Sequence, residues 1–431
     1  MDKTTFNKEL LGFINDSPTA FHAVRNISAV LSGNGFVRLN ESDSWNIESG
    51  KKYFVTRNDS SIIAFSSGTA EAINTGIRIL GAHTDSPCLK LKPKPLYAET
   101  SCSMLGVEVY GGVMLRTWFD RELSIAGRIT FSRNDNKQYS VLVDFKRPMA
   151  IIPSLALHMN KDANTAQPIN AQKELPALVA CASSESEMNF NEILKTQIEL
   201  EHKLVDVKAI LAHDLFLYDC NMASVFGIKN EFIAGARLDN LLSCFIGLKA
   251  ALNAEGAPPF ALVFNDHEET GSLSFHGASG SFLRDILGRL YPTVEEHARV
   301  LNRSMLISMD NAHASHPNYA ESHEPHHRSV INGGPAIKVN AGQRYSTNSE
   351  THATIRAIAM KLDLPVQTFV MRSDIPCGTT IGPITSAETG VKAVDIGVPT
   401  FAMHSIRETA GVDDAYILFQ ILDDLLKGGS E

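Results

Sequence analysis

The chain has 431 residues, of which 44% are hydrophobic and 20% charged, and this composition is typical of a globular protein with two or three domains. A formal net charge of -9 without a basic stripe argues against nucleic acid as a partner. Six scattered cysteines without a CxxC pair, no recognisable signal sequence and no apolar run of membrane-spanning length predict a cytoplasmic protein with no membrane partner.

Residues 1–35 predict two helices. The second is expected to begin with Ser17 as its N-cap and Pro18 in the first helical position, and to stop near Gly33. Three strands are then predicted, at residues 53–55, 62–65 and 77–80. The third strand leads directly into residues 81–85, which places a histidine and an aspartate at its carboxyl end.

The composition changes between residues 93 and 225, where β-branched runs alternate with turn residues and predict a β-rich unit. Its strands are expected at residues 107–110, 128–131 and 139–143. Strands then alternate with helices again, with strands predicted at 261–264, 305–309, 368–371 and 393–396 and a last helix from about 412. The prediction is therefore an α/β domain with a mainly parallel central sheet flanked by helices. This domain comprises residues 1–92 and 226–431, and the β-rich segment 93–225 is inserted into it.

Polar residues stand where the apolar strands stop, and open α/β sheets bind ligands at the carboxyl ends of their strands. These residues are His83, Asp85, Glu268, Glu269, Asp310 and His404, and Asp239 precedes an apolar helical run at 241–251. Histidines and carboxylates without cysteine are typical of an open hydrolytic site for zinc, cobalt or manganese. The number of ligands fits two ions, which a shared carboxylate can bridge.

The adjacent pair Glu268 and Glu269 predicts a division of labour at this site. One side chain can bind metal while the other contacts a bridging water, takes its proton as general base and returns that proton to the leaving amine. Asp85 is expected to orient the imidazole of His83. Each residue taken alone has a structural alternative, since a histidine at a strand end is usually a hydrogen-bonded structural residue and a glutamate pair usually starts a helix. The ordered set at successive strand ends carries the prediction.

Six segments resemble those of aspartyl aminopeptidases, in the same order and over nearly the whole chain. They are GAHTDSP at 81–87, ARLDN at 236–240, DHEETGS at 266–272, MDNAHA with HPNY at 309–319, CGTTIGP at 377–383 and AMHSIRE at 402–408. The resemblance implies that the metal ligands are His83, Asp239, Glu269, Asp310 and His404. It implies that Asp239 bridges two divalent ions, with zinc expected and cobalt or manganese as alternatives.

The same resemblance assigns Glu268 as the general base and Asp85 as the support of His83. One ion is expected on His83 and Asp310, and the other on Glu269 and His404. The implied fold is of the zinc exopeptidase type, interrupted by a β-rich dimerisation domain. The implied assembly is a homo-oligomer, a tetrahedral dodecamer built from dimers.

The implied reaction removes single residues from peptides with a free N-terminus. Family members often favour aspartate or glutamate at that position, which requires a fixed cation in the pocket. Lys338 could pair with the substrate carboxylate and Tyr345 could hydrogen-bond to it, although Lys338 could instead be an exposed strand residue. Broader or non-acidic specificity stays open.

His158, within residues 155–159, matches a histidine that family members extend from the β-rich domain into a neighbouring subunit's active site. The alternative is a histidine on a helix surface or in the core. A histidine-rich stretch at 313–327 is predicted to be a loop beside Asp310, with most of its imidazoles in solvent, rather than a third metal site.

Two competing functions come from other classes. A catalytically silent assembly protein would have lost a ligand or Glu268, and all of these residues are present. A related two-metal hydrolase of carboxy-terminal or acylated substrates would lack the segment at 377–383 as it stands here.

Overall fold

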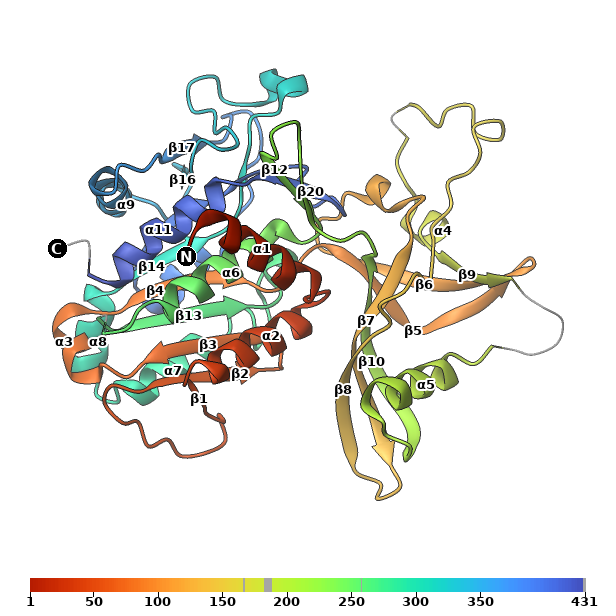
Figure 1. Ribbon diagram of the computed structural model, residues 1–431, viewed down its shortest axis with the longest axis horizontal. Helices are drawn as coiled ribbons and strands as arrows, with labels where there is room; N and C mark the ends of the chain where they lie inside the picture. The colour runs from red at the N-terminus through yellow and green to blue at the C-terminus, as the bar shows by residue number, and fades with distance from the viewer. Residues whose placement is uncertain (166, 182–187, 257, 429–431) are drawn as a thin grey trace. The chain divides into compact units, whose positions relative to one another are not determined.

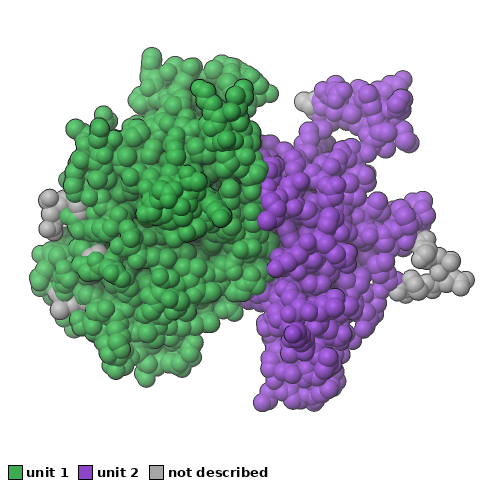
Figure 2. Space-filling model, viewed as in Figure 1, with its two compact units in different colours: residues 1–86, 223–403, 408–431 green, residues 87–222, 404–407 purple. Residues whose placement is uncertain are grey.

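The computed structural model describes residues 1–165, 167–181, 188–256 and 258–428. The chain forms two compact units, which Figure 2 shows in green and purple. Unit 1 consists of Met1–Ser86, Ala223–Met403 and Glu408–Glu431, and unit 2 of Pro87–Met222 and His404–Arg407. The sequence predicted an inserted segment at 93–225, and it did not predict that residues 404–407 group with unit 2.

A nine-stranded sheet forms the centre of unit 1 (Figure 1). Its strands, in spatial order, are β1 (Val37–Arg38), β2 (Lys52–Arg57), β3 (Ser61–Ser66), β13 (Phe260–Asn265), β4 (Arg78–His83), β14 (Met305–Met309), β18 (Lys392–Gly397), β16 (Ala336–Val339) and β17 (Gln367–Val370). The four neighbours β13, β4, β14 and β18 are parallel to one another. Their residues are buried almost throughout, as expected for parallel strands covered on both faces. The predicted α/β class is confirmed.

Successive side chains of these strands enter two different cores. In β13, Leu262 and Phe264 belong to one hydrophobic cluster, whereas Ala261 and Val263 belong to another, because side chains alternate across a strand. The first cluster is completed by α1 (Lys3–Asn15), α2 (Ala20–Gly33), α6 (Leu238–Leu252), α9 (Ser349–Lys361) and α11 (Asp414–Leu426). The second is completed by α3 (Thr69–Thr75), α7 (Phe282–Leu290) and α8 (Val294–Arg303). The sheet is thus covered by helices on both faces.

Unit 1 also contains a five-stranded sheet. Its order is β11 (Ser224–Phe226), β12 (Phe232–Gly235), β20 (Glu408–Gly411), β19 (Pro399–Phe401) and β15 (Ala312–His313). The apolar run before His404 was grouped by sequence with the strands whose ends form the site. In the structure this run forms the strand β19, which pairs with β15 and β20 and is not part of the central sheet.

The second helix begins later than the sequence predicted. Thr19, not Ser17, is the N-cap of α2, and its side chain accepts a hydrogen bond from the backbone N–H of His22. Ser17 is buried before the helix, where its backbone N–H donates to Ile14 and its hydroxyl accepts from the Asn26 amide. Because these bonds occupy Ser17, the cap lies two residues nearer the C-terminus than predicted. The predicted end at Gly33 is confirmed.

The remaining elements of unit 1 are short. They are α10 (Ile381–Thr389), η2 (Glu268–Thr270) and η3 (Pro317–Ser322), the last two being 3-10 helices. Within the described residues, every helix is too short or too polar to span a membrane.

Unit 2 is built on a six-stranded sheet in which every neighbouring pair is antiparallel. In spatial order the strands are β8 (Gln138–Asp144), β7 (Leu123–Arg133), β10 (Val207–Asp219), β5 (Cys88–Glu99), β6 (Cys102–Tyr110) and β9 (Ala177–Cys181). The unit also contains η1 (Leu115–Trp118), α4 (Ala171–Glu174) and α5 (Phe190–His202), which buries Leu194 and Ile198 in the core of the unit.

Candidate metal centre

Three neighbouring parallel strands bring the candidate ligands of unit 1 to one edge of the central sheet. In the β13–β4 pair, Asn265 lies opposite His83, which is the last residue of β4. Asp310 directly follows β14, and η2 with its glutamates begins shortly after β13. Parallel strands end on the same side of a sheet, so these polar residues converge as the sequence predicted.

The buried imidazole of His83 faces two carboxylates. Its Nε2 lies 3.4 Å from Oδ1 of Asp239 and 3.9 Å from Oδ1 of Asp310. These separations exceed a normal hydrogen bond, but they approach the roughly 3.3 Å between two atoms that bind one zinc ion tetrahedrally. One donor atom from each of the three residues lies within 4.8 Å of the others. The geometry therefore fits a shared cation.

Asp239 is held through its backbone at the start of α6. Its N–H donates to Oε2 of Glu408 at 3.1 Å, and its carbonyl accepts from the hydroxyl of Ser86 at 2.6 Å. Neither Asp239 nor Asn240 has helical backbone angles, and the Asn240 side chain donates to the carbonyl of Met309 at 2.8 Å. Sequence analysis did not single out Glu408 and Ser86, although both lie inside recognised motifs.

Asp85 connects the end of β4 to η2. Its Oδ1 accepts from the backbone N–H of Glu268 at 3.2 Å and its Oδ2 from that of Glu269 at 3.1 Å. Nδ1 of His83 lies 3.1 Å from the Asp85 carbonyl and 3.4 Å from its Oδ1. Asp85 thus lies beside one nitrogen of His83 while the other nitrogen faces the carboxylates. The sequence had anticipated the contact with His83 but not the bonds to both glutamates.

The cluster concentrates negative charge in a poorly solvated place. Desolvation raises the pKa of Glu268 to about 8, and His83 opposes this while Asp310 and Asp85 add to it. The pKa of Glu269 is also raised well above its usual value by desolvation and then by Asp239. For His83, burial alone would lower the pKa, but the surrounding carboxylates raise it well above its ordinary value. Carboxylates crowded in this way favour cations, so the residues present fit the binding of divalent metal.

Lys338 lies on β16 against this cluster. It is 2% exposed, its Nζ lies 3.4 Å from Oδ2 of Asp310, and it donates to the carbonyl of Asn311 at 3.1 Å. The same Nζ lies 4.9 Å from the ring centroid of Tyr345, which is also buried. The alternative of an exposed strand residue is therefore wrong for Lys338. Burial raises the pKa of Tyr345, so its phenol stays protonated and able to donate.

The two remaining predicted site residues, His158 and His404, belong to unit 2. His404 has a left-handed backbone, and its Nδ1 lies 3.0 Å from the carbonyl of Gly112. His158 lies in an exposed turn between Leu157 and Met159, which are also exposed. It is therefore neither on a helix surface nor in the core, which were the two structural alternatives. The metal role of His404 and the catalytic role of His158 stay predictions.

The histidine-rich stretch is only partly as predicted. His326 and His327 are exposed, but His313, His316 and His323 are half-buried, so fewer imidazoles lie in solvent than expected. The backbone N–H of His316 donates to Nε2 of His323 at 2.9 Å. Among the described residues, no group of three potential metal ligands includes any of these histidines.

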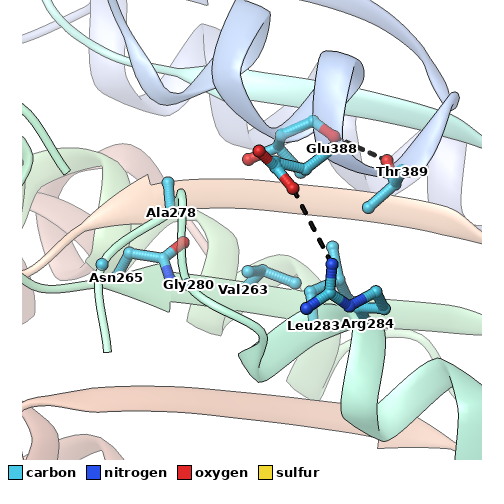
Figure 3. Close-up of a pocket in the computed structure, with 10 residues that line it drawn as sticks. Val263, Asn265, Ala278, Gly280, Leu283, Arg284, Glu388 and Thr389 are labelled. Carbon is cyan, nitrogen blue, oxygen red and sulfur yellow. Dashed lines mark hydrogen bonds and ion pairs between the residues drawn. The ribbon is translucent and has the colours of Figure 1, made fainter. Parts of the chain in front are cut away.

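A separate pocket of unit 1 lies between β13, α7 and α10 (Figure 3). Arg284 and Glu388 face each other across it at 4.0 Å. None of the lining residues belongs to the predicted site. The pocket therefore adds no group to the candidate metal centre.

Comparison with known families decides the class of this site. A family model described as Aminopeptidase I zinc metalloprotease (M18) matches residues 13–425. The chain belongs to the M18 family of zinc aminopeptidases. This family includes the aspartyl aminopeptidases, so the resemblance found in the motifs is confirmed, as is the prediction of a zinc-dependent exopeptidase.

Individual M18 relatives can be aligned with this chain over almost its full length. The "Probable M18 family aminopeptidase 2" of Pseudomonas syringae pv. syringae is 50% identical over 420 residues, 97% of each chain. The solved "Cryo-EM structure of the Ape4 and Nbr1 complex" has a TM-score of 0.95 at 36% identity, covering 99% of this chain and 86% of that one. The "Structure of S. cerevesiae mApe1 dodecamer" has a TM-score of 0.85 at 26% identity, covering 97% and 96%.

Proposed function

We propose that this M18 aminopeptidase removes single residues from peptide N-termini with two divalent ions, most simply zinc. The proposed ligands are His83, Asp239, Glu269, Asp310 and His404, with Asp239 shared between the ions. The proposal rests chiefly on the three-residue group of His83, Asp239 and Asp310, whose separations fit one ion. Bound zinc would polarise the scissile carbonyl. It would also lower the pKa of a bound water, so that this water can lose a proton and act as nucleophile at neutral pH.

Within this site we assign Glu268 the role of general base. Its backbone N–H is fixed by Asp85, and its carboxylate lies in the group formed with His83 and Glu269. A carboxylate so placed can take the proton of the attacking water and return it to the leaving amine. Asp85, which touches neither water nor peptide in this scheme, positions Glu268, Glu269 and His83.

Removing the metal should abolish activity. Carboxylates cannot act as a Lewis acid in place of the metal ions. Prolonged chelation should therefore reduce hydrolysis of N-terminal aminoacyl substrates to background. Added zinc, cobalt or manganese should restore it, with elemental analysis confirming each state and circular dichroism confirming that the fold survives. Full activity in protein shown to be free of metal would refute the proposal.

For the side chain of the substrate we propose a preference for aspartate or glutamate. Lys338 supplies a fixed cation beside the centre, and Tyr345 supplies a buried phenol next to it. A second candidate is broader specificity, because the charge of Lys338 already faces Asp310 and its amino group already donates to Asn311. A substrate panel with acidic and neutral N-terminal residues separates these two specificities.

Lys338→Met tests the acidic preference directly. If Lys338 binds the substrate carboxylate, kcat/KM for acidic substrates should fall by roughly 30-fold or more relative to neutral ones, because losing one member of a buried charge pair costs about 2–5 kcal/mol. Lys361→Met, at an exposed lysine paired with Asp424, is the matched control. An equal fall for both substrate classes would instead assign Lys338 to the support of Asp310.

We further propose a homo-oligomer, and specifically a dodecamer built from dimers. Its support is the solved mApe1 dodecamer, to which the chain is similar over nearly its whole length. The exposed apolar side chains Leu155, Leu157 and Met159 around His158 are the kind of surface that a second subunit would cover. The cytoplasmic location and the bounds of the predicted insertion stay predictions.

A further inference from the structure

Unit 1 holds another group of potential metal ligands, outside the proposed centre. Asp266, His267 and His276 each offer a donor atom within 4.8 Å of the other two. Asp266 and His276 are both 5% exposed, while His267 is half-buried. Asp266 and His267 immediately precede η2, and His276 follows it at the end of the same loop. None of the three has a role in the proposed peptidase reaction.

Both imidazoles approach the same carboxylate oxygen. Oδ2 of Asp266 lies 3.4 Å from Nε2 of His276 and 3.8 Å from Nε2 of His267. Both distances are longer than an N–H···O hydrogen bond, yet they are close to the roughly 3.3 Å between two ligands of one tetrahedral zinc ion. The two rings lie 4.4 Å apart, so both nitrogens belong to one small group of donors.

The ring of His276 is buried without a strong hydrogen bond. Its Nδ1 has no hydrogen-bond partner among the described residues, and its Nε2 is 3.4 Å from both Asp266 and the amide of Asn58. The nitrogen that faces Asp266 is Nε2, whose two contacts are both long, and a bond from Nε2 to a metal ion would replace these weak contacts.

Ser61 of β3 holds this arrangement in place through the backbone. Its hydroxyl accepts from the N–H of Asp266 at 2.8 Å and donates to the carbonyl of His276 at 2.7 Å. Oδ1 of Asp266 accepts from the N–H of His267 at 2.9 Å. Since Oδ1 is occupied in this way, Oδ2 is the oxygen that faces the imidazoles. The donors are therefore preorganised by contacts that need no metal.

We propose that Asp266, His267 and His276 bind a further divalent cation, separate from the two-metal centre. Two imidazoles and one carboxylate select zinc, cobalt or nickel rather than magnesium or calcium. Three protein ligands leave a fourth position for water, and the partly exposed His267 gives the ion a route from solvent.

The ion would join the two ends of the loop that begins with Glu268 and Glu269. This loop is already compact, because the N–H of Ser272 donates to the carbonyl of His267 at 2.7 Å. A Cβ on Gly277 would lie only 2.4 Å from the carbonyl oxygen of Ser272, so only glycine fits there. A cation on His267 and His276 would further restrict η2, and its role is to position that segment rather than to take part in catalysis.

The test is the number of zinc ions bound per chain by the full-length protein. Metal-free wild type and His276→Gln are each reloaded with zinc, dialysed and measured by elemental analysis. The variant should bind one zinc ion fewer than the wild type. In the wild type the last equivalent of zinc should raise the melting temperature, and in the variant this increase should be absent. His326→Gln, which removes an exposed histidine, is the matched control and should bind as many ions as the wild type.

His83→Ala separates this proposal from the two-metal proposal. It should lose zinc from the peptidase centre but keep the ion that depends on His276, so His83→Ala with His276→Gln should lose both. If His276→Gln does not fold, His267→Gln at the partly exposed ligand is measured instead. Equal zinc content and equal thermal shifts in the wild type and the histidine variant would overturn the further site, whatever the count at His83.

Discussion

Glu268→Gln is expected to lower kcat by roughly 10²–10⁴-fold, because a general base acts in the transition state rather than in substrate binding. The amide cannot accept the proton of the attacking water, but its size and its backbone bond to Asp85 are unchanged. KM should therefore change little, and the zinc content should equal that of the wild type. Steady-state kinetics and elemental analysis on the same preparation measure both quantities.

Glu269→Gln is the matched variant for this experiment. Its backbone N–H is held by the other oxygen of Asp85, so both variants keep the same backbone support. As a proposed ligand, Glu269 should instead be needed for metal, and its amide variant should lose zinc as well as activity. If the two variants lose equal amounts of zinc, the division of labour between these neighbours is wrong.

His158→Ala is expected to fold, assemble and bind its metals while kcat falls by roughly 10²–10³-fold. This is the usual effect of removing one hydrogen-bond donor to a developing oxyanion. The exposed turn that carries His158 gives the residue no structural role within unit 2, so the variant should not be destabilised. His202→Ala, at an exposed histidine of α5, is the control and should keep full activity.

Mixing subunits tests whether His158 acts on another chain. Subunits with His158→Ala and subunits with Glu268→Gln should each be nearly inactive alone. In co-assembled oligomers, a site can combine Glu268 from one chain with His158 from its neighbour, which would restore about a quarter of the sites for equal random mixing. No recovery in oligomers verified as mixed would mean that His158 serves its own subunit or no site.

Much of unit 1 was predicted correctly because short apolar runs within the sequence mark its strands and its last helix. The apolar runs at 261–264 and 305–309 lie in β13 and β14, and the helix expected from about 412 is α11. The predicted start of a helix was less accurate where two nearby residues could both serve as its N-cap. Ser17 and Thr19 are both capable N-caps, and the bond from Asn26 to Ser17 is a tertiary contact that no short window contains.

The sequence alone determined the peptidase family and the polar residues that follow the strands. Both depend on short runs of residues and on the order of these runs, which the sequence contains directly. Only the tertiary structure decided how these residues meet. It placed Lys338 inside the protein against Asp310, although a lysine in a strand is usually exposed. It also brought His276 back to Asp266 through Ser61 of a strand far away in the sequence. Such contacts depend on which strands become neighbours, and strand pairing is set by the packing of the whole sheet rather than by any local segment.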